Sequence, residues 1–261
     1  MASTAPIKLT SEQLQQFREQ GYLVVENLLN RREVEEFLAN EDRPEVKAEW
    51  TNLLLHHKNQ VRDYLAKHSN IAGVASQILE GMPRIVQTMF LPKAPATAED
   101  KSQNVGIALH QDTHYLPNEP NTLMACWIAM NDTDEENGGL CVVPGSHKGG
   151  LLSTHRAAEQ QEHVSWEVEY DMIDPDGRKY KKKFYSFEID GLDQESILRL
   201  TVPEGGGVFF HGMLIHGSYA NRSTTRWRKA FAVHYIKDGT WLYRADVHDT
   251  DPVSRFATPK P

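Results

Sequence analysis

The sequence predicts a mainly β protein with flanking α-helices, organised as a double-sheet jelly roll. From Pro83 onward, short strand-like runs alternate with Gly, Pro, Asn and Asp turns, which is typical of a sandwich or barrel. No regular alternation of strands and helices follows Pro83, which argues against a parallel Rossmann-like sheet. Before Pro83 most apolar residues recur at helical spacing, so we expect helices packed outside the sheets.

The N-terminal elements carry recognisable boundaries. We expect one helix capped by Thr10 or Ser11 and ended by Gly21, and a second helix capped by Asn30. A short strand and a further helical pattern complete this part, at Tyr22–Leu29 and about Val46–Leu79.

The strands of the jelly roll are expected where β-branched and aromatic residues lie between turns. The expected strands are Arg84–Leu91, Val105–His110, Leu123–Met130, Leu140–Val143, Glu167–Met172, Lys183–Ile189, Ser196–Leu200, Gly207–Leu214 and Lys229–Ile236.

Length, charge and cysteine count indicate the domain organisation and exclude several classes of protein. We expect a single domain over residues 1–261, with a mainly helical part at 1–82, a core at 83–240 and a tail at 241–261. The net charge of −8 argues against a nucleic-acid surface. No membrane span and no secretory signal are expected. Cys126 and Cys141 are too few for a disulfide framework, so we expect two buried free thiols and a cytoplasmic location.

A metal site is indicated by the segment that contains His110 and Asp112. On a strand, residues two apart share a face, so His110, Asp112 and His114 would point the same way. Two His and one carboxylate on one face of an octahedral ion leave the other face open, as in non-haem iron oxygenases. The second His would come from His211 or His216, which lie five residues apart and face opposite sides of an unbroken strand. Parity alone leaves that choice open.

An anion site is indicated by the strand that begins near Arg228. Arg228, Ala230, Ala232 and His234 would share one face, and the two alanines leave room beside the guanidinium. Arginine binds carboxylates through a planar fork, so this face suits a small dicarboxylate. A salt-bridged surface arginine is the alternative.

Several blocks together resemble the phytanoyl-CoA dioxygenase family. The likeness covers about residues 84–235, in this order: His110-Gln-Asp-Thr-His-Tyr, Trp127-Ile-Ala-Met, Asn137-Gly-Gly-Leu, Val143-Pro-Gly-Ser-His-Lys-Gly, Phe209-Phe-His-Gly-Met-Leu-Ile-His-Gly-Ser218 and Trp227-Arg-Lys-Ala.

The resemblance implies a double-stranded β-helix (cupin-like jelly roll) that uses iron(II) and 2-oxoglutarate. By position, His110, Asp112 and His216 match the metal ligands, and Arg228 matches the arginine that binds the far carboxylate of 2-oxoglutarate. In the same way, the cosubstrate pocket would include Gln111, Trp127 and Ser218. The loop before Arg228 is about one residue longer than in well-known members, so Arg226 remains a second candidate for the arginine.

The resemblance also implies the reaction. O2 and 2-oxoglutarate would be consumed, succinate and CO2 released, and a small-molecule substrate hydroxylated; the carboxylate of Asp112 argues against halogenation. A non-redox jelly-roll isomerase or hydrolase and a non-catalytic binding module remain as alternatives. The substrate, the oligomeric state and a direct role for His114 stay open. His147 is expected in a structural loop, and the basic run 177–183 is expected on a solvated hairpin. The last residues, Thr-Pro-Lys-Pro, give no expectation of a peroxisomal address.

Overall fold

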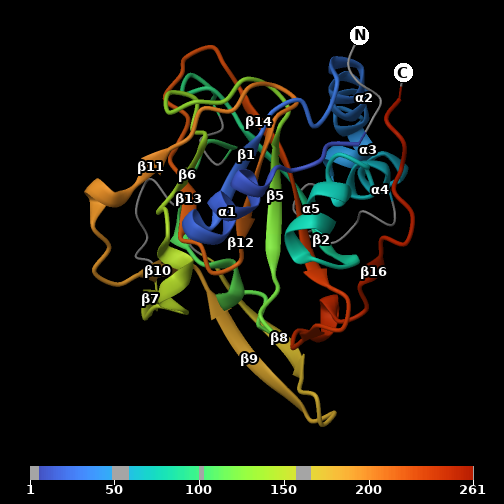
Figure 1. Ribbon diagram of the computed structural model, residues 1–261. Coiled ribbons are helices and arrows are strands. Elements are labelled where there is room, and N and C mark those ends of the chain that lie inside the picture. Colours follow the sequence, from blue (N-terminus) through green and yellow to red (C-terminus); the bar gives the residue numbers. More distant parts are fainter. Residues whose placement is uncertain (1–5, 49–58, 100–102, 157–165, 261) are drawn as a thin grey trace.

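The computed structural model describes residues 6–48, 59–99, 103–156 and 166–260, and it has the predicted jelly roll with helices outside. In Figure 1 the long strands β5, β14 and β2 run through the middle of the molecule. Helices α2, α4 and α5 lie on one side of them, and the short strands β11, β6 and β13 lie on the other. Within the described ranges, no helix is long and apolar enough to cross a membrane.

The larger sheet is antiparallel, and its two edge strands come from near the two ends of the chain. Its order is β1 (Tyr22–Val25), β12 (Gly207–His211), β5 (Met124–Ala129), β14 (Arg228–Lys237), β2 (Pro83–Lys93) and β16 (Asp251–Pro252). Because β14 lies between β5 and β2, it is hydrogen-bonded on both edges along most of its length.

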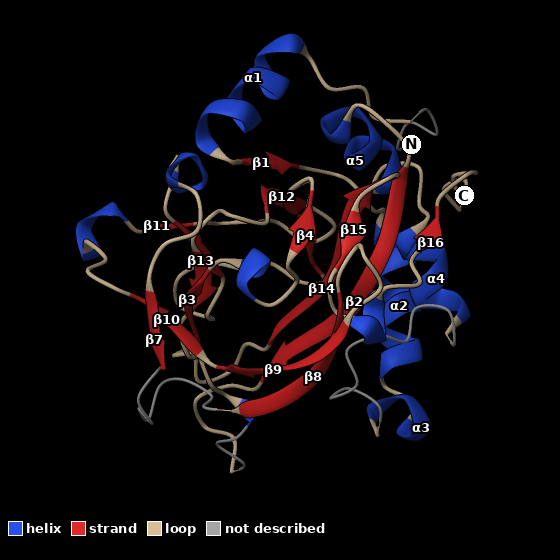
Figure 2. Ribbon diagram, turned by 90° about the horizontal axis from the view of Figure 1, so that it is seen from below, coloured by secondary structure: helices blue, strands red, loops and turns tan. Residues whose placement is uncertain are grey.

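The smaller sheet faces the larger one and is built from short strands. Its order is β11 (Leu198–Arg199), β6 (Leu140–Val142), β13 (His216–Ser218) and β3 (Ile107–His110). The view from below in Figure 2 separates β3 and β13 on one side from β14 and β2 on the other. The space between these two groups of strands is where the inward-pointing residues meet.

Side chains alternate along β14, and the alternation decides what each face does. Phe231, Val233 and Tyr235 belong to a large apolar cluster shared with the helices. Ala230 and Ala232 belong to a second cluster, between the sheets. Large side chains therefore anchor the helices, while small ones leave room between the sheets, as the sequence predicted.

The helices begin where the sequence indicated. Capping boxes open α1 (Ser11–Gln20) and α2 (Arg31–Glu41), with Thr10 and Asn30 as the N-caps. Gly21 ends α1 at φ 79°, and a Cβ there would meet the ring of His147 at 2.4 Å. Only glycine satisfies both the positive φ and this close approach. His147 thus holds a structural loop against α1, as expected.

The expected helical pattern over 46–79 is divided in the structure. It contains α3 (Pro44–Lys47), α4 (Gln60–Ala66) and α5 (Ala72–Leu79), and residues 49–58 of the pattern lie outside the described residues. Apolar spacing continues across the break between α4 and α5 because Leu65 and Ile71 both pack into the same core. Periodicity therefore reports the shared core rather than one unbroken helix.

One hairpin and two two-stranded ribbons complete the strands outside the two main sheets. Their strands are β8 (Glu167–Ile173) with β9 (Lys179–Tyr185), β7 (Thr154–Arg156) with β10 (Phe187–Ile189), and β4 (Asn118–Glu119) with β15 (Trp241–Leu242). The expectation of one strand over 183–189 was wrong, because the chain leaves β8 after Tyr185 and pairs with β7. The basic run lies on the projecting β8–β9 hairpin (Figure 1), where Lys181 and Lys183 are exposed beside Glu169 and Glu167.

Candidate metal centre

His110, Asp112 and His216 meet in the space between the sheets. Their ligand atoms lie within 4.8 Å of one another, and the structure offers no second such group of His, Cys, Asp or Glu in its described part. Asp112 Oδ1 lies 3.3 Å from His110 Nε2 and 3.5 Å from His216 Nε2. The two imidazole rings are 4.4 Å apart between centroids.

The two histidines converge because their strands pair. His110 ends β3 and His216 begins β13, and the two residues are directly opposite in the antiparallel register. Each ring is fixed through Nδ1, His110 on the carbonyl of Ala108 at 2.7 Å and His216 on the carbonyl of Leu214 at 2.9 Å. Both Nε2 atoms are thereby left to face Asp112.

Asp112 reaches the site by a route that the sequence did not predict. It is not on β3, because the strand ends at His110 and Asp112 opens a short 3-10 helix, Asp112–His114. Strand parity was therefore the wrong reason to place His110, Asp112 and His114 on one face, because Asp112 and His114 are not on the strand. On a continuing strand each residue adds about 3.3 Å, so the carboxylate would lie well beyond His110. The tight 3-10 turn instead brings the carboxylate back beside both rings. His114 faces elsewhere, with Nε2 3.1 Å from the carbonyl oxygen of Leu152.

The electrostatics of the cluster favour a bound cation. Burial alone would raise the pKa of Asp112, but the facing imidazoles of His216 and His234 hold it well below its usual range. Burial lowers the pKa of His216 to about 4, so its ring is neutral at pH 7. The cluster therefore presents one carboxylate and neutral imidazole nitrogen, the protonation states that a divalent metal needs.

His234 was named in the sequence only as a member of a strand face, yet it contacts the cluster. Its Nε2 lies 3.0 Å from Asp112 Oδ2, and its side chain is buried. The repeating face of β14 carried the signal, because Arg228, Ala230, Ala232 and His234 alternate inward together.

A buried cationic pair lies at the other end of this face. Arg228 and Lys93 are directly opposite each other across β14 and β2, and they are only 2% and 3% exposed. Lys93 Nζ donates to Ser218 Oγ at 2.8 Å and to the carbonyl of Tyr219 at 2.5 Å. Burial and the neighbouring Arg228 lower the pKa of Lys93 well below its usual range. Lys93 is a site residue that sequence reasoning missed; the signal was a lysine ending an apolar strand.

Arg228 is incompletely satisfied. Its Nη1 donates to the carbonyl of Leu91 at 2.9 Å, but its Nε has no hydrogen-bond partner among the described residues. Burial lowers the pKa of Arg228 to about 9. In the described part of the chain, no carboxylate forms an ion pair with Arg228 or Lys93, whereas buried cations are ordinarily paired. The arrangement is one that an incoming anion completes.

Arg226 is engaged at the surface. Its guanidinium binds Asp134 at 2.8 Å and Glu136 at 2.6 Å, both in the acidic loop 132–137. These bonds to carboxylates raise the pKa of Arg226 above its ordinary value. Between the two candidates from the sequence, only Arg228 is buried and without a carboxylate partner.

The remaining pocket residues of the sequence prediction have different environments. The Trp127 ring lies 5.8 Å from the Arg228 guanidinium, and Ser218 accepts from Lys93. Gln111, however, is fully buried, and its amide bonds the backbone of Gly150, Leu152 and Met213. Gln111 thus ties together the loops on either side of the cluster, and its place in the cosubstrate pocket stays a prediction.

Aromatic side chains from β10 and from the segments that contain Tyr115 and Trp166 flank the metal cluster. Tyr115 lies 5.4 Å from the ring of His110, and it also contacts Phe187 at 5.0 Å and Trp166 at 5.3 Å. Trp166 is 37% exposed, so this aromatic wall extends from the cluster to solvent.

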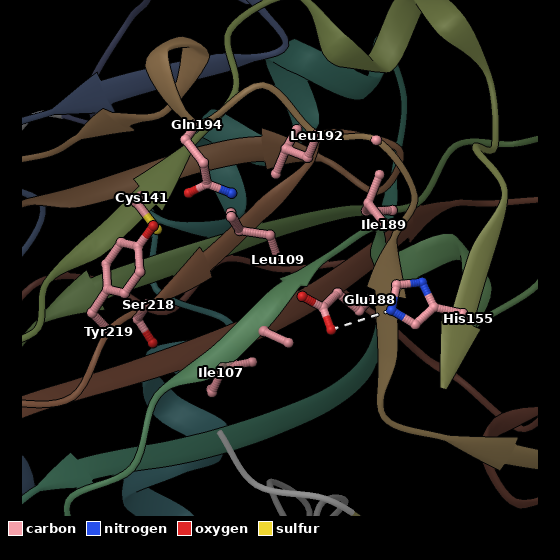
Figure 3. A pocket seen from close by; sticks show the side chains of 12 residues that line it. Ile107, Leu109, Cys141, His155, Glu188, Ile189, Leu192, Gln194, Ser218 and Tyr219 are labelled. Atoms are coloured by element: carbon pink, nitrogen blue, oxygen red, sulfur yellow. Dashed lines mark ion pairs between the residues drawn. The ribbon is translucent and has the colours of Figure 1, made fainter. Parts of the chain in front are cut away.

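A cavity of about 420 Å³ lies close to the smaller sheet, and Figure 3 shows its side chains. Leu109 and Ile107 of β3 line it together with Ile189 and Leu192. Leu109 and His110 are adjacent on a strand and so point to opposite faces. None of His110, Asp112 and His216 lines the cavity, whereas Ser218, which accepts from Lys93, does.

Comparison with known proteins identifies the family. The family model described as phytanoyl-CoA dioxygenase (PhyH) matches residues 17–230, well over half of the chain. The human peroxisomal phytanoyl-CoA dioxygenase is 29% identical over 268 residues, covering 93% of this chain and 71% of that protein.

Solved structures agree on the fold. The nogalamycin epimerase SnoN, in complex with Fe3+, alpha ketoglutarate and nogalamycin RO, is 19% identical with a TM-score of 0.65, covering 96% of this chain and 95% of that one. The nogalamycin carbocyclase SnoK is 22% identical with a TM-score of 0.65, covering 98% of each chain. The chain belongs to the phytanoyl-CoA dioxygenase family, and it is an enzyme of the iron- and 2-oxoglutarate-dependent dioxygenase class.

Proposed function

We propose that this enzyme hydroxylates a small organic substrate, with iron(II) held by His110, Asp112 and His216 and with 2-oxoglutarate as cosubstrate. The observation that carries the proposal is the presence of two complementary features in one space between the sheets. One is a His-Asp-His cluster in which both Nε2 atoms face the carboxylate, and the other is a buried cationic pair without a described carboxylate partner.

The donor set fits iron(II). Two imidazoles and one carboxylate on one side of an octahedral ion leave three adjacent positions for other ligands. His110, Asp112 and His216 would hold the ion and leave its other side for the cosubstrate and dioxygen. When bound, this group supplies the oxidative step: one oxygen atom enters a C–H bond of the substrate, and the other enters succinate as 2-oxoglutarate loses CO2.

The cationic pair fits the far carboxylate of 2-oxoglutarate. Arg228 offers an unpartnered Nε beside Nη1, and Lys93 adds a second nitrogen donor from the opposite strand. Ser218 fixes Lys93 and follows His216 by two residues on β13, so the anion end and the metal end of the site share one strand. We assign Arg228 rather than Arg226 to this role, because Asp134 and Glu136 already neutralise Arg226.

The aromatic wall formed by Tyr115, Phe187 and Trp166 is proposed to receive the substrate. It begins beside His110, and it reaches solvent at Trp166. Such a wall favours a substrate with apolar or unsaturated surface near the C–H bond that reacts.

The wider context of the enzyme is also part of the proposal. We propose one oxygenase domain over residues 1–261 and a cytoplasmic location, since Cys126 and Cys141 are both buried free thiols. The human relative is named as peroxisomal, and that location belongs to that protein.

The test is an anaerobic visible spectrum of the purified protein with iron(II) and 2-oxoglutarate. We expect a weak metal-to-ligand charge-transfer band that requires both additions. His216→Ala should abolish the band, and Arg228→Ala should shift its half-saturation to higher 2-oxoglutarate concentration. A wild-type protein that binds iron(II) tightly yet gives no band would contradict the proposal and would favour a non-redox metalloenzyme. A protein that binds no divalent metal would favour a binding module.

A further inference from the structure

His234 divides the two oxygens of Asp112 between two tasks. Its Nε2 lies 3.0 Å from Oδ2 of Asp112, while Oδ1 is the oxygen that faces the Nε2 atoms of His110 and His216. His234 itself is not a member of the metal-ligating group. His234 lies on the inward face of β14 in the larger sheet, opposite the sheet that carries His110 and His216, and it is 4% exposed.

The direction of this hydrogen bond follows from the neighbours of the ring. A carboxylate only accepts, so Nε2 must carry the hydrogen. On the other side of the ring, Nδ1 lies 3.4 Å from the amide nitrogen of Gln87, which only donates. A hydrogen on Nε2 and a lone pair on Nδ1 suit these two partners. Gln87 is buried on β2, so the order Gln87, His234, Asp112 crosses from the larger sheet to the cluster.

We propose that His234 is a positioning residue that makes Asp112 a one-oxygen metal ligand. By donating to Oδ2, it holds that oxygen away from the metal and turns Oδ1 toward it. The consequence matters for an octahedral ion, because an aspartate that binds through both oxygens would occupy one of the three positions needed by the cosubstrate and dioxygen. The importance of the open position rests on the proposed function; the control of the carboxylate does not.

The experiment compares two amide side chains at position 234 in the 261-residue chain, with Co(II) as the metal probe. The Gln side chain of His234→Gln extends its N–H to about the place of Nε2, whereas the shorter Asn of His234→Asn does not reach Asp112. Tyr235→Phe is the matched control: it removes one buried hydrogen bond, to the carbonyl of Ala66, from the other face of the same strand. Thermal unfolding of each metal-free variant reports whether the fold is retained.

Co(II) affinity is measured by calorimetry, and the carboxylate stretches by infrared difference spectra of the Co(II)-bound and metal-free forms. We expect His234→Asn to weaken Co(II) binding by about 10- to 100-fold, the usual effect of losing a partner of a ligand. We also expect it to narrow the gap between the asymmetric and symmetric carboxylate stretches, as two-oxygen binding does. His234→Gln and Tyr235→Phe should keep the wild-type affinity within about threefold, with the wild-type gap.

Equal weakening in the Gln and Asn variants, or wild-type behaviour in both, would overturn the positioning role. These readouts need no 2-oxoglutarate and no turnover. A protein that binds Co(II) through a one-oxygen Asp112 but forms no cosubstrate chelate would refute the proposed function and leave the role of His234 intact.

Discussion

Arg228→Met separates the cost of the cationic pair to the fold from its benefit to cosubstrate binding. Burial lowers the pKa of Arg228 from its ordinary value to about 9. At about 1.4 kcal/mol per unit, keeping the guanidinium charged costs on the order of 5 kcal/mol in the protein without ligand. Met fills the volume of the stem without the charge, and replacing buried ions by apolar side chains commonly stabilises by about 1–4 kcal/mol. We therefore expect the metal-free variant to be more stable than the wild type by about that amount.

The same change should remove most of the affinity for 2-oxoglutarate. Leaving a buried charge without its partner costs about 3–5 kcal/mol, which is a loss of about two to four powers of ten in affinity. Stability is measured by urea unfolding of the metal-free protein, and affinity by calorimetric titration of the Co(II)-loaded protein with 2-oxoglutarate. Arg226→Met is the control, because its exposed ion pairs contribute about 1 kcal/mol or less and should leave the affinity unchanged. A variant at 228 that loses several kcal/mol of stability but keeps the cosubstrate affinity would refute this reasoning.

Three further outcomes are expected. His216→Ala should weaken Co(II) binding by at least about 100-fold in calorimetry, because a two-ligand site remains; an unchanged affinity would remove His216 from the metal site. Gln111→Leu should lower the free energy of unfolding by about 3 kcal/mol and speed amide exchange at Leu152, since buried backbone groups lose their partners. A loss under about 0.5 kcal/mol would show that Gln111 does not tie these loops together. Burial raises the pKa of Glu33, but hydrogen bonds from His68 and Tyr64 outweigh it and lower the pKa to about 2. Because the folded pKa is depressed, the stability from Glu33 is complete above about pH 4.5 and is lost as the pH falls toward 2. The urea midpoint should therefore decrease as the pH falls from about 4.5 to 2, and Glu33→Gln should make this decrease smaller. The same pH dependence in the wild type and in Glu33→Gln would show that Glu33 is not its source.

Local rules account for much of the fold. The capping boxes at Thr10 and Asn30, and the positive φ at Gly21, depend on neighbours within a few residues, so the sequence predicted the ends of α1 and the start of α2. The inward and outward faces of β14 also followed from sequence, because side chains alternate along any strand and the small residues there occupy every second position. Where the chain turned unexpectedly, as at Tyr185, the competing interaction was pairing with β7, a segment distant in sequence.

The candidate site divides in the same way. By itself, the sequence determined which residue types were available for metal and anion binding: the His-x-Asp pair, the later histidines and the arginine at the start of a strand. Only the tertiary structure decided how they combine. The register of β3 against β13 places His216 opposite His110, and a 3-10 turn rather than strand parity brings Asp112 to both. Packing of β14 against β2 pairs Arg228 with Lys93, and the distance between the sheets brings His234 to Asp112. These contacts join residues up to 135 positions apart in the chain, and no local spacing rule specifies such distances because they depend on how the two sheets pack face to face.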